Sequence, residues 1–258
     1  MSEPVVYFYT DFGGGGPYTG LMESALLRHC PAAKVIDLLS EAPAFSPRHA
    51  SCLLAAMVPW LLPDSTVVAV VDPGVGGPRM PIVVESGGRR YLGPDNGLFS
   101  GVMQGDDSRA WLIRWPEEMP SASFHGRDLF APAAGKLLAG EALDLEPLPR
   151  DSLEGHDWPL DLHEVIFIDH FGNVMTGLRA SALKASARIA VAGRVLRAQT
   201  TFSDVPVGEP FWYRNSLGLV EIAVNRGRAD RTLGLSIGDP VAVLSGEVSP
   251  LGNPGKAG

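Results

Sequence analysis

The chain has 258 residues, a net charge of −8 and a pI near 5.2, with 45% hydrophobic and 19% charged residues. Such a composition excludes bulk disorder, and the negative charge leaves no broad basic surface for a nucleic-acid backbone. Because no apolar run approaches the roughly 18 residues of a membrane span and no export signal begins the chain, we expect no nucleic-acid or membrane partner and a cytoplasmic location.

Strand and helix patterns alternate along the first half of the chain. Short apolar runs predict buried strands at Val5–Thr10, Lys34–Leu39 and Thr66–Val71. Apolar residues at helical spacing predict helices over Tyr18–His29 and Ser46–Leu62, the second opening with a serine cap and a proline. Further strand patterns and one helix pattern follow at 81–85, 90–92, 110–114 and 128–138. Buried strands between helices favour an α/β fold with a mostly parallel sheet flanked by helices.

The pattern changes across Glu146–Leu162, where prolines, glycines and acids interrupt the apolar residues, as is typical of a linker. Beyond it, strand patterns alternate with turn signals at roughly 8–12 residue spacing. They lie at 164–169, 173–178, 187–191, 194–198, 210–214, 219–224 and 240–244. We therefore predict an α/β domain over residues 1–155 and a smaller all-β barrel domain over residues 162–248. The two cysteines, Cys30 and Cys52, are interpreted as free apolar thiols.

Two polar motifs directly follow predicted strands, at the positions where open α/β sheets bind ligands. Asp11 enters a glycine-rich loop before a helix, so it suits a pair of ribose hydroxyls unless it only caps that helix. Asp72 enters a second Pro/Gly loop that returns Arg79, so these two residues form either a fixed pair in a site or a surface ion pair. The glycines match neither a P-loop nor a dinucleotide-binding fingerprint.

Four further polar motifs are ambiguous when taken singly. Asp95 and Asn96 lie in a Gly-Pro-Asp-Asn-Gly segment that also fits an ordinary turn. His125 precedes a predicted helix, where a histidine is commonly a packed or capping residue. In the second half, the segments 169–173 and 213–218 are polar clusters between apolar strands, which are either hairpin turns or ligand contacts.

Together and in this order, the motifs resemble the S-adenosylmethionine (SAM) hydroxide adenosyltransferases, relatives of the fluorinating and chlorinating enzymes, over residues 5 to 245. The resemblance implies an N-terminal α/β domain, a C-terminal β-barrel and homotrimers with active sites between subunits. It places an Asp-Arg-His set around the nucleophilic water at Asp72, Arg79 and His125, where the halogenating relatives differ at the first and last positions. The substrate-binding residues that it implies are Asp11, Phe12, Tyr18, Asp95, Asn96, Asp169, Phe171, Asn173, Asn215 and Ser216.

The activity that the resemblance implies is hydrolysis of SAM to adenosine and methionine, by attack of water or hydroxide on the ribose C5′. Arg79 then supplies positive charge, Asp72 orients it, and His125 is the better base because arginine keeps its proton. SAM is the substrate, and neither a cofactor nor a metal is expected. The alternatives are a SAM-dependent halogenase and a non-catalytic SAM or adenosine sensor. Departures from many relatives at Gly16, Pro17 and Leu217 leave the contacts to the methionine end open.

Overall fold

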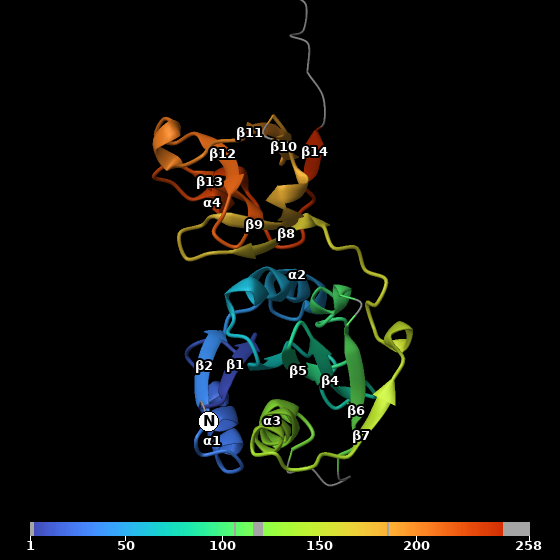
Figure 1. Ribbon diagram of the computed structural model, residues 1–258. Helices are drawn as coiled ribbons and strands as arrows, with labels where there is room; N and C mark the ends of the chain where they lie inside the picture. Colours follow the sequence, from blue (N-terminus) through green and yellow to red (C-terminus); the bar gives the residue numbers. More distant parts are fainter. Residues whose placement is uncertain (1–2, 106, 116–120, 185, 245–258) are drawn as a thin grey trace, which may run out of the picture. The chain divides into compact units, whose positions relative to one another are not determined.

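The computed structural model describes residues 3–105, 107–115, 121–184 and 186–244. The chain divides into two compact units, the first ending at Leu162 and the second beginning at His163 (Figure 1). No helix within the described residues is long and apolar enough to cross a membrane. The two units are described separately below.

A seven-stranded sheet in the order β2-β1-β3-β5-β4-β6-β7 forms the centre of the first unit. Its strands are β1 (Val5–Thr10), β2 (Lys34–Leu39), β3 (Thr66–Val70), β4 (Pro81–Ser86), β5 (Arg89–Pro94), β6 (Arg109–Ile113) and β7 (Leu145–Leu148). Strands β2, β1, β3 and β5 run parallel, whereas β4, β6 and β7 pair antiparallel. The sheet is therefore mixed, and the prediction of a mostly parallel sheet is wrong for the half that contains β4, β6 and β7.

The antiparallel half begins at the hairpin between β4 and β5. Gly87 and Gly88 connect these strands with φ of 55° and 72°, and two consecutive residues at positive φ are what the tightest hairpin turns require. Strand β7 was also missed, because it lies at the start of the segment interpreted as a linker and contains Pro147. Proline is tolerated there because β7 is an edge strand.

Helices cover both faces of this sheet (Figure 1). On one face, residues of β1 and β3 pack against helix α2 (Pro47–Met57). On the other face, the alternate residues of the same strands pack against α1 (Tyr18–Leu27) and α3 (Ala131–Leu138). The alternation of side chains along a strand produces these two clusters. The serine cap predicted for α2 is not made, because Ser46 Oγ pairs with His49 Nδ1 at 2.6 Å.

Helices α2 and α3 have other bounds than predicted. Helix α2 gives way at residue 58 to a short 3-10 turn, Val58–Trp60, that contains a proline. Helix α3 is preceded by a wider π-helical turn, Gly126–Phe130, so helical structure starts two residues earlier than predicted. His125 is the residue directly before this π-helical turn.

The described residues of the second unit form two β-sheets and one short α-helix, besides two 3-10 turns. Its strands are β8 (Leu162–Ile168), β9 (Val174–Arg179), β10 (Arg188–Val191), β11 (Arg194–Arg197), β12 (Pro210–Arg214), β13 (Leu219–Val224) and β14 (Ala242–Leu244). They form a sheet β12-β13-β9-β8 and a sheet β11-β10-β14 around one apolar cluster. The strand positions predicted from the sequence are confirmed, whereas helix α4 (Ala229–Leu233) was not predicted. Closure into a barrel stays a prediction.

Candidate functional site

Asp72, Arg79 and His125 form one hydrogen-bonded chain beyond the carboxyl end of β3. Arg79 Nε donates to both oxygens of Asp72, at 3.0 and 2.8 Å, and Arg79 Nη2 donates to Asp72 Oδ2 as well. The same Nη2 donates to His125 Nδ1 at 2.7 Å. The side chains of Arg79 and Asp72 are only 11% and 4% exposed, so the interpretation as a surface ion pair is wrong.

Glycines allow the tight turn of the loop between Asp72 and Arg79. Gly76 has a φ of 79°, and a Cβ there would lie 3.0 Å from the carbonyl oxygen of Ala122. Gly77 N donates to Gly74 O at 2.9 Å. The loop therefore turns sharply enough to bring Arg79 back to the carboxylate from which the loop begins.

His125 is buried next to a permanent cation. Burial lowers the pKa of the imidazole, and the positive charge of Arg79 lowers that pKa further. Because a guanidinium only donates hydrogen bonds, His125 Nδ1 must be the acceptor, and the neutral ring carries its proton on Nε2. The free nitrogen of this ring is thus an N–H donor. The role of base that the sequence suggested for His125 does not suit this geometry.

Asp11 lies beyond β1, the strand next to β3. Its Oδ2 accepts a hydrogen bond from the backbone N–H of Phe45 at 3.0 Å, and burial raises its pKa. The alternative that Asp11 caps α1 is wrong, because the residue at the cap position is Pro17 and no side chain bonds there. The backbone contacts of Asp11 leave its carboxylate with capacity for further donors, as a pair of ribose hydroxyls would supply.

Phe12 and Tyr18 connect this first motif to the histidine. Their rings and that of Phe124 contact one another edge to face, with centroids 5.4 to 5.8 Å apart. Phe124 directly precedes His125, and Tyr18 remains 47% exposed. Two motifs that are far apart in the sequence therefore share one aromatic cluster.

Asp95 and Asn96 have structural partners. Asn96 Nδ2 donates to the carbonyl of Val71 at 2.9 Å, and Asp95 Oδ1 accepts from the N–H of Glu154 at 3.0 Å. Asn96 thus supports the backbone immediately before Asp72. The turn interpretation holds for the local geometry, and the effect of this turn on the site is indirect.

The remaining predicted residues line one pocket of the second unit, with a volume of about 800 Å³. They are Asp169, Phe171, Asn173, Asn215 and Ser216. Phe171 is 72% exposed, so its ring is free to stack on a flat ligand. Asp169 accepts hydrogen bonds from the N–H of Asn173 at 2.8 Å and from its Nδ2 at 3.1 Å, which fixes the turn between β8 and β9.

Sequence reasoning missed Glu221, which also lines this pocket, beside Tyr213 of the predicted polar segment 213–218. Glu221 accepts hydrogen bonds from the hydroxyl of Tyr213 and, at 2.8 Å, from Asn215 Nδ2. Asn215 Oδ1 accepts from Leu217 N and Leu219 N at 3.0 and 2.9 Å, so Asn215 shapes the turn that carries Ser216. A glutamate in the otherwise apolar strand 219–224 was the signal that could have found this network.

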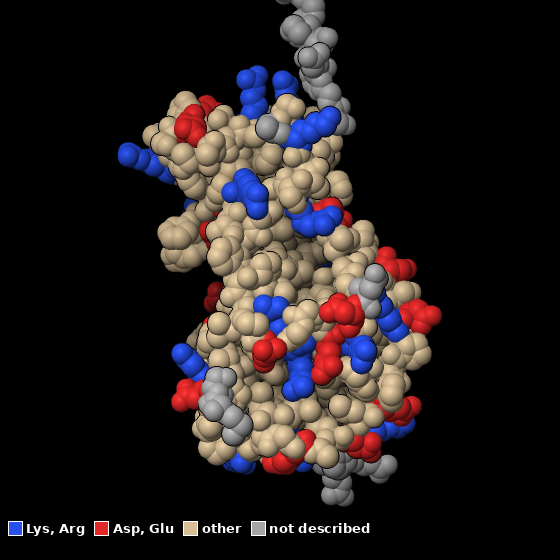
Figure 2. All heavy atoms as spheres, viewed as in Figure 1, with Lys and Arg blue, Asp and Glu red and all other residues tan. Residues whose placement is uncertain are grey.

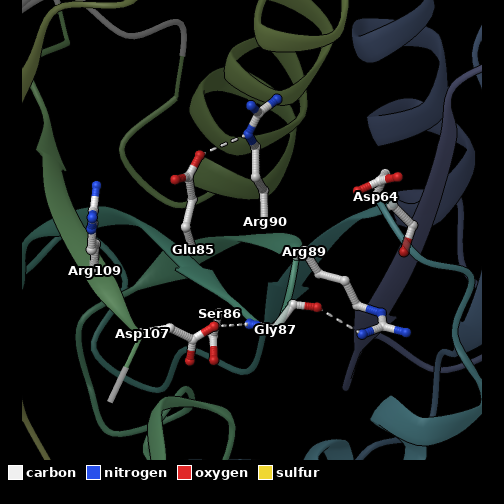
Figure 3. Close-up of a pocket in the computed structure, with 10 residues that line it drawn as sticks. Asp64, Glu85, Ser86, Gly87, Arg89, Arg90, Asp107 and Arg109 are labelled. Carbon is white, nitrogen blue, oxygen red and sulfur yellow. Dashed lines mark hydrogen bonds and ion pairs between the residues drawn. The ribbon is translucent and has the colours of Figure 1, made fainter. Parts of the chain in front are cut away.

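A separate pocket of about 430 Å³ lies where β3 and β5 begin, at the other end of these strands from Asp72 (Figure 3). Its charges are largely satisfied nearby, since Arg90 pairs with Glu85 at 3.0 Å and Arg89 donates to backbone carbonyls. Figure 2 shows basic and acidic side chains intermixed on the visible face, without a broad basic area. Within the described parts of the chain, no cluster of three or more His, Cys, Asp or Glu could hold a metal ion.

The chain matches the models of two domains of one family. The SAM hydroxide adenosyltransferase N-terminal domain matches residues 6–146, and the C-terminal domain of the same family matches residues 163–242. The matches confirm a two-domain architecture. The chain belongs to the SAM hydroxide adenosyltransferase family.

Individual relatives are similar over nearly the full length. A protein of Thermus thermophilus named (R)-S-adenosyl-L-methionine hydrolase is 38% identical, covering 93% of this chain and 99% of the relative. One of the same name from Salinispora arenicola is 36% identical, covering 95% and 99%. An uncharacterized conserved protein from Thermotoga maritima has a similar crystal structure, with a TM-score of 0.80 and 30% identity over 92% of this chain and 99% of that one.

Proposed function

We propose that this protein hydrolyses SAM to adenosine and L-methionine. The observation that carries the proposal is the buried Asp72–Arg79–His125 chain, which is built to hold a small polar reactant beside fixed positive charge. The names of the relatives at 36–38% identity support the same reaction. Asp11 would hold the ribose hydroxyls, and Phe171 would stack on the adenine.

The proton positions favour attack by hydroxide. In the reaction, an oxygen forms a bond to the ribose C5′ while the bond from C5′ to sulfur breaks, and the sulfonium leaves as the neutral thioether of methionine. Since the leaving group needs no proton, the site has only to supply the nucleophile. A neutral His125 offers Nε2–H, which can donate to hydroxide, and Arg79 adds positive charge in a buried setting where it is poorly screened.

Asp72 is the positioning group of this arrangement. Its two oxygens hold Arg79 through Nε and Nη2, which leaves the guanidinium with a fixed orientation toward His125. A fixed donor costs no reorganisation when charge develops in the transition state. The proposed roles are therefore orientation for Asp72, positive field for Arg79 and hydrogen-bond donation for His125.

The test is incubation of the protein with SAM, followed by chromatography of the products. We expect adenosine and methionine in equal amounts. Recovery of unchanged SAM after long incubation at several pH values, despite measurable binding, would support the sensor and refute the hydrolase. 5′-Chloro-5′-deoxyadenosine in chloride buffer would instead identify a halogenase.

Several expectations from the sequence remain proposals. These are a cytoplasmic location, the absence of a cofactor, domains at 1–155 and 162–248, the closed C-terminal barrel, and a homotrimer with active sites between subunits. The mass of the assembly in solution tests the homotrimer directly.

A further inference from the structure

Glu221 is a buried acid without a cationic partner. The residue is 3% exposed in strand β13, whose six residues are all buried. Within the described residues, its hydrogen-bond partners are the neutral groups of Tyr213 and Asn215, and no lysine, arginine or histidine pairs with it. Buried carboxylates are normally paired with a cation, because removing an unpaired charge from water is costly.

The hydrogen bonds around Glu221 suit the ionised carboxylate. Asn215 Oδ1 is occupied by two backbone N–H groups, so the amide orientation is fixed and Nδ2 faces Glu221. Two donors, one on each carboxylate oxygen, leave each oxygen able to accept again. Burial, with a smaller contribution from the charge of Asp169, raises the pKa of Glu221 above its ordinary value although the two donors oppose the rise, and a cation placed beside this carboxylate would favour its ionised form.

The other charged residues of the pocket do not neutralise Glu221. Arg228 is held by Asp230, through contacts of 3.1 and 2.8 Å, and by the carbonyl of His170 at 2.7 Å. Arg226 is exposed, at the rim of the pocket. Asp169 adds a second negative charge. The inner part of the pocket is thus negative, with apolar walls that include Phe171 and Met175.

We infer that Glu221 supplies the counter-charge for a positively charged group of the ligand, so that this pocket selects cationic adenosyl compounds over neutral ones. The inference rests on the proposed function for the class of ligand. SAM has two positive groups, the sulfonium and the amino-acid ammonium, and both are absent from the nucleoside product. A charge-dependent pocket would therefore favour binding of substrate over retention of adenosine.

The test is calorimetry of the full-length protein with three compounds that are stable in the assay. Sinefungin carries a positive charge in place of the sulfonium and also an ammonium. S-adenosylhomocysteine keeps only the ammonium, and 5′-methylthioadenosine has neither. Glu221→Gln keeps the shape of the side chain and removes its charge. Glu209→Gln, at an exposed glutamate of the same unit, is the matched control.

We expect Glu221→Gln to weaken sinefungin about tenfold and 5′-methylthioadenosine less than twofold, while the control changes neither. An equal loss of affinity for S-adenosylhomocysteine would indicate that Glu221 faces the ammonium. An unchanged affinity for that compound would indicate that Glu221 faces the sulfonium position. An equal loss for all three compounds, or a loss for none, would overturn the inference and leave the proposed function standing. If the wild-type protein binds none of them, both proposals fail.

Discussion

At the scale of single residues, one nitrogen atom of Arg79 joins the site together. Arg79 Nη2 donates to both Asp72 and His125, so removing either end disturbs the other. We expect His125→Ala and Arg79→Ala each to lower kcat about 10²–10³-fold, the usual loss for one preorganised donor, with little effect on KM. The double variant should lose much less than the product of the two.

The measurement is steady-state kinetics with SAM, and Arg109→Ala is the control, at an exposed arginine of the far pocket. Variants that raise KM and leave kcat unchanged would show that these side chains bind substrate only.

His125 also sets a direction for the pH dependence. Protonation would place a hydrogen on Nδ1 against the N–H of Arg79, and burial lowers the pKa of this imidazole. Because hydroxide becomes scarcer as the pH decreases, kcat should fall with pH in the wild-type protein and in His125→Ala alike. We expect an additional loss from protonation of His125, present only in the wild-type protein, at pH values below about 6.5, the ordinary histidine pKa. Stability should follow the same sign, because the unfolded chain takes up the proton first as the pH decreases.

A pH–rate profile alongside thermal melts at each pH would measure both effects. An acid step of kcat that is centred above about 6.5 and disappears in His125→Ala would contradict the assignment, since it would require a histidine that is easier to protonate than in water.

At the scale of elements, the loop after β3 depends on Gly76. A side chain there would need a φ of 79° and would meet the carbonyl of Ala122 at 3.0 Å. We expect Gly76→Ala to destabilise the fold by about 1–2 kcal/mol and to lower kcat, because the loop can no longer hold Arg79 in place. Gly20→Ala, in the open on helix α1, should leave kcat unchanged. Chemical denaturation and kinetics of both variants check this, and equal behaviour would refute it.

Most strands of both units could be predicted from short apolar runs, because a buried strand needs apolar residues at nearly every position. The runs did not reveal pairing direction, since β4 has the same buried character in either orientation. Helix α4 is only five residues long, too short for a periodic pattern. In the site, Asp72 and Arg79 were found because they are close in sequence. Glu221 was not found, because its link to Tyr213 and Asn215 depends on the pairing of β13 with β12, which the sequence does not show.

At the scale of the whole molecule, the open question is assembly. Among the large apolar side chains that are exposed in the described part of the first unit, four gather around the site, with fractions of 38–79%. They are Tyr18, Leu21, Phe45 and Val75, in or near the first two loop motifs. Together with the family resemblance, this exposure leads us to expect a homotrimer of about three times 27.4 kDa by light scattering. Full activity at the mass of a single chain would contradict this expectation.

The branched contact of Arg79 has a consequence for sequence drift. Its planar guanidinium donates to Asp72 through two nitrogens and to His125 through one of the same two. A lysine has one nitrogen and no such plane, so a change that preserves charge would still break the junction. The exchange of arginine for lysine, which is often tolerated on protein surfaces, should therefore not be tolerated at this position. Related proteins in which another residue replaces Arg79 should therefore have a different activity, and not a slightly slower form of the same one.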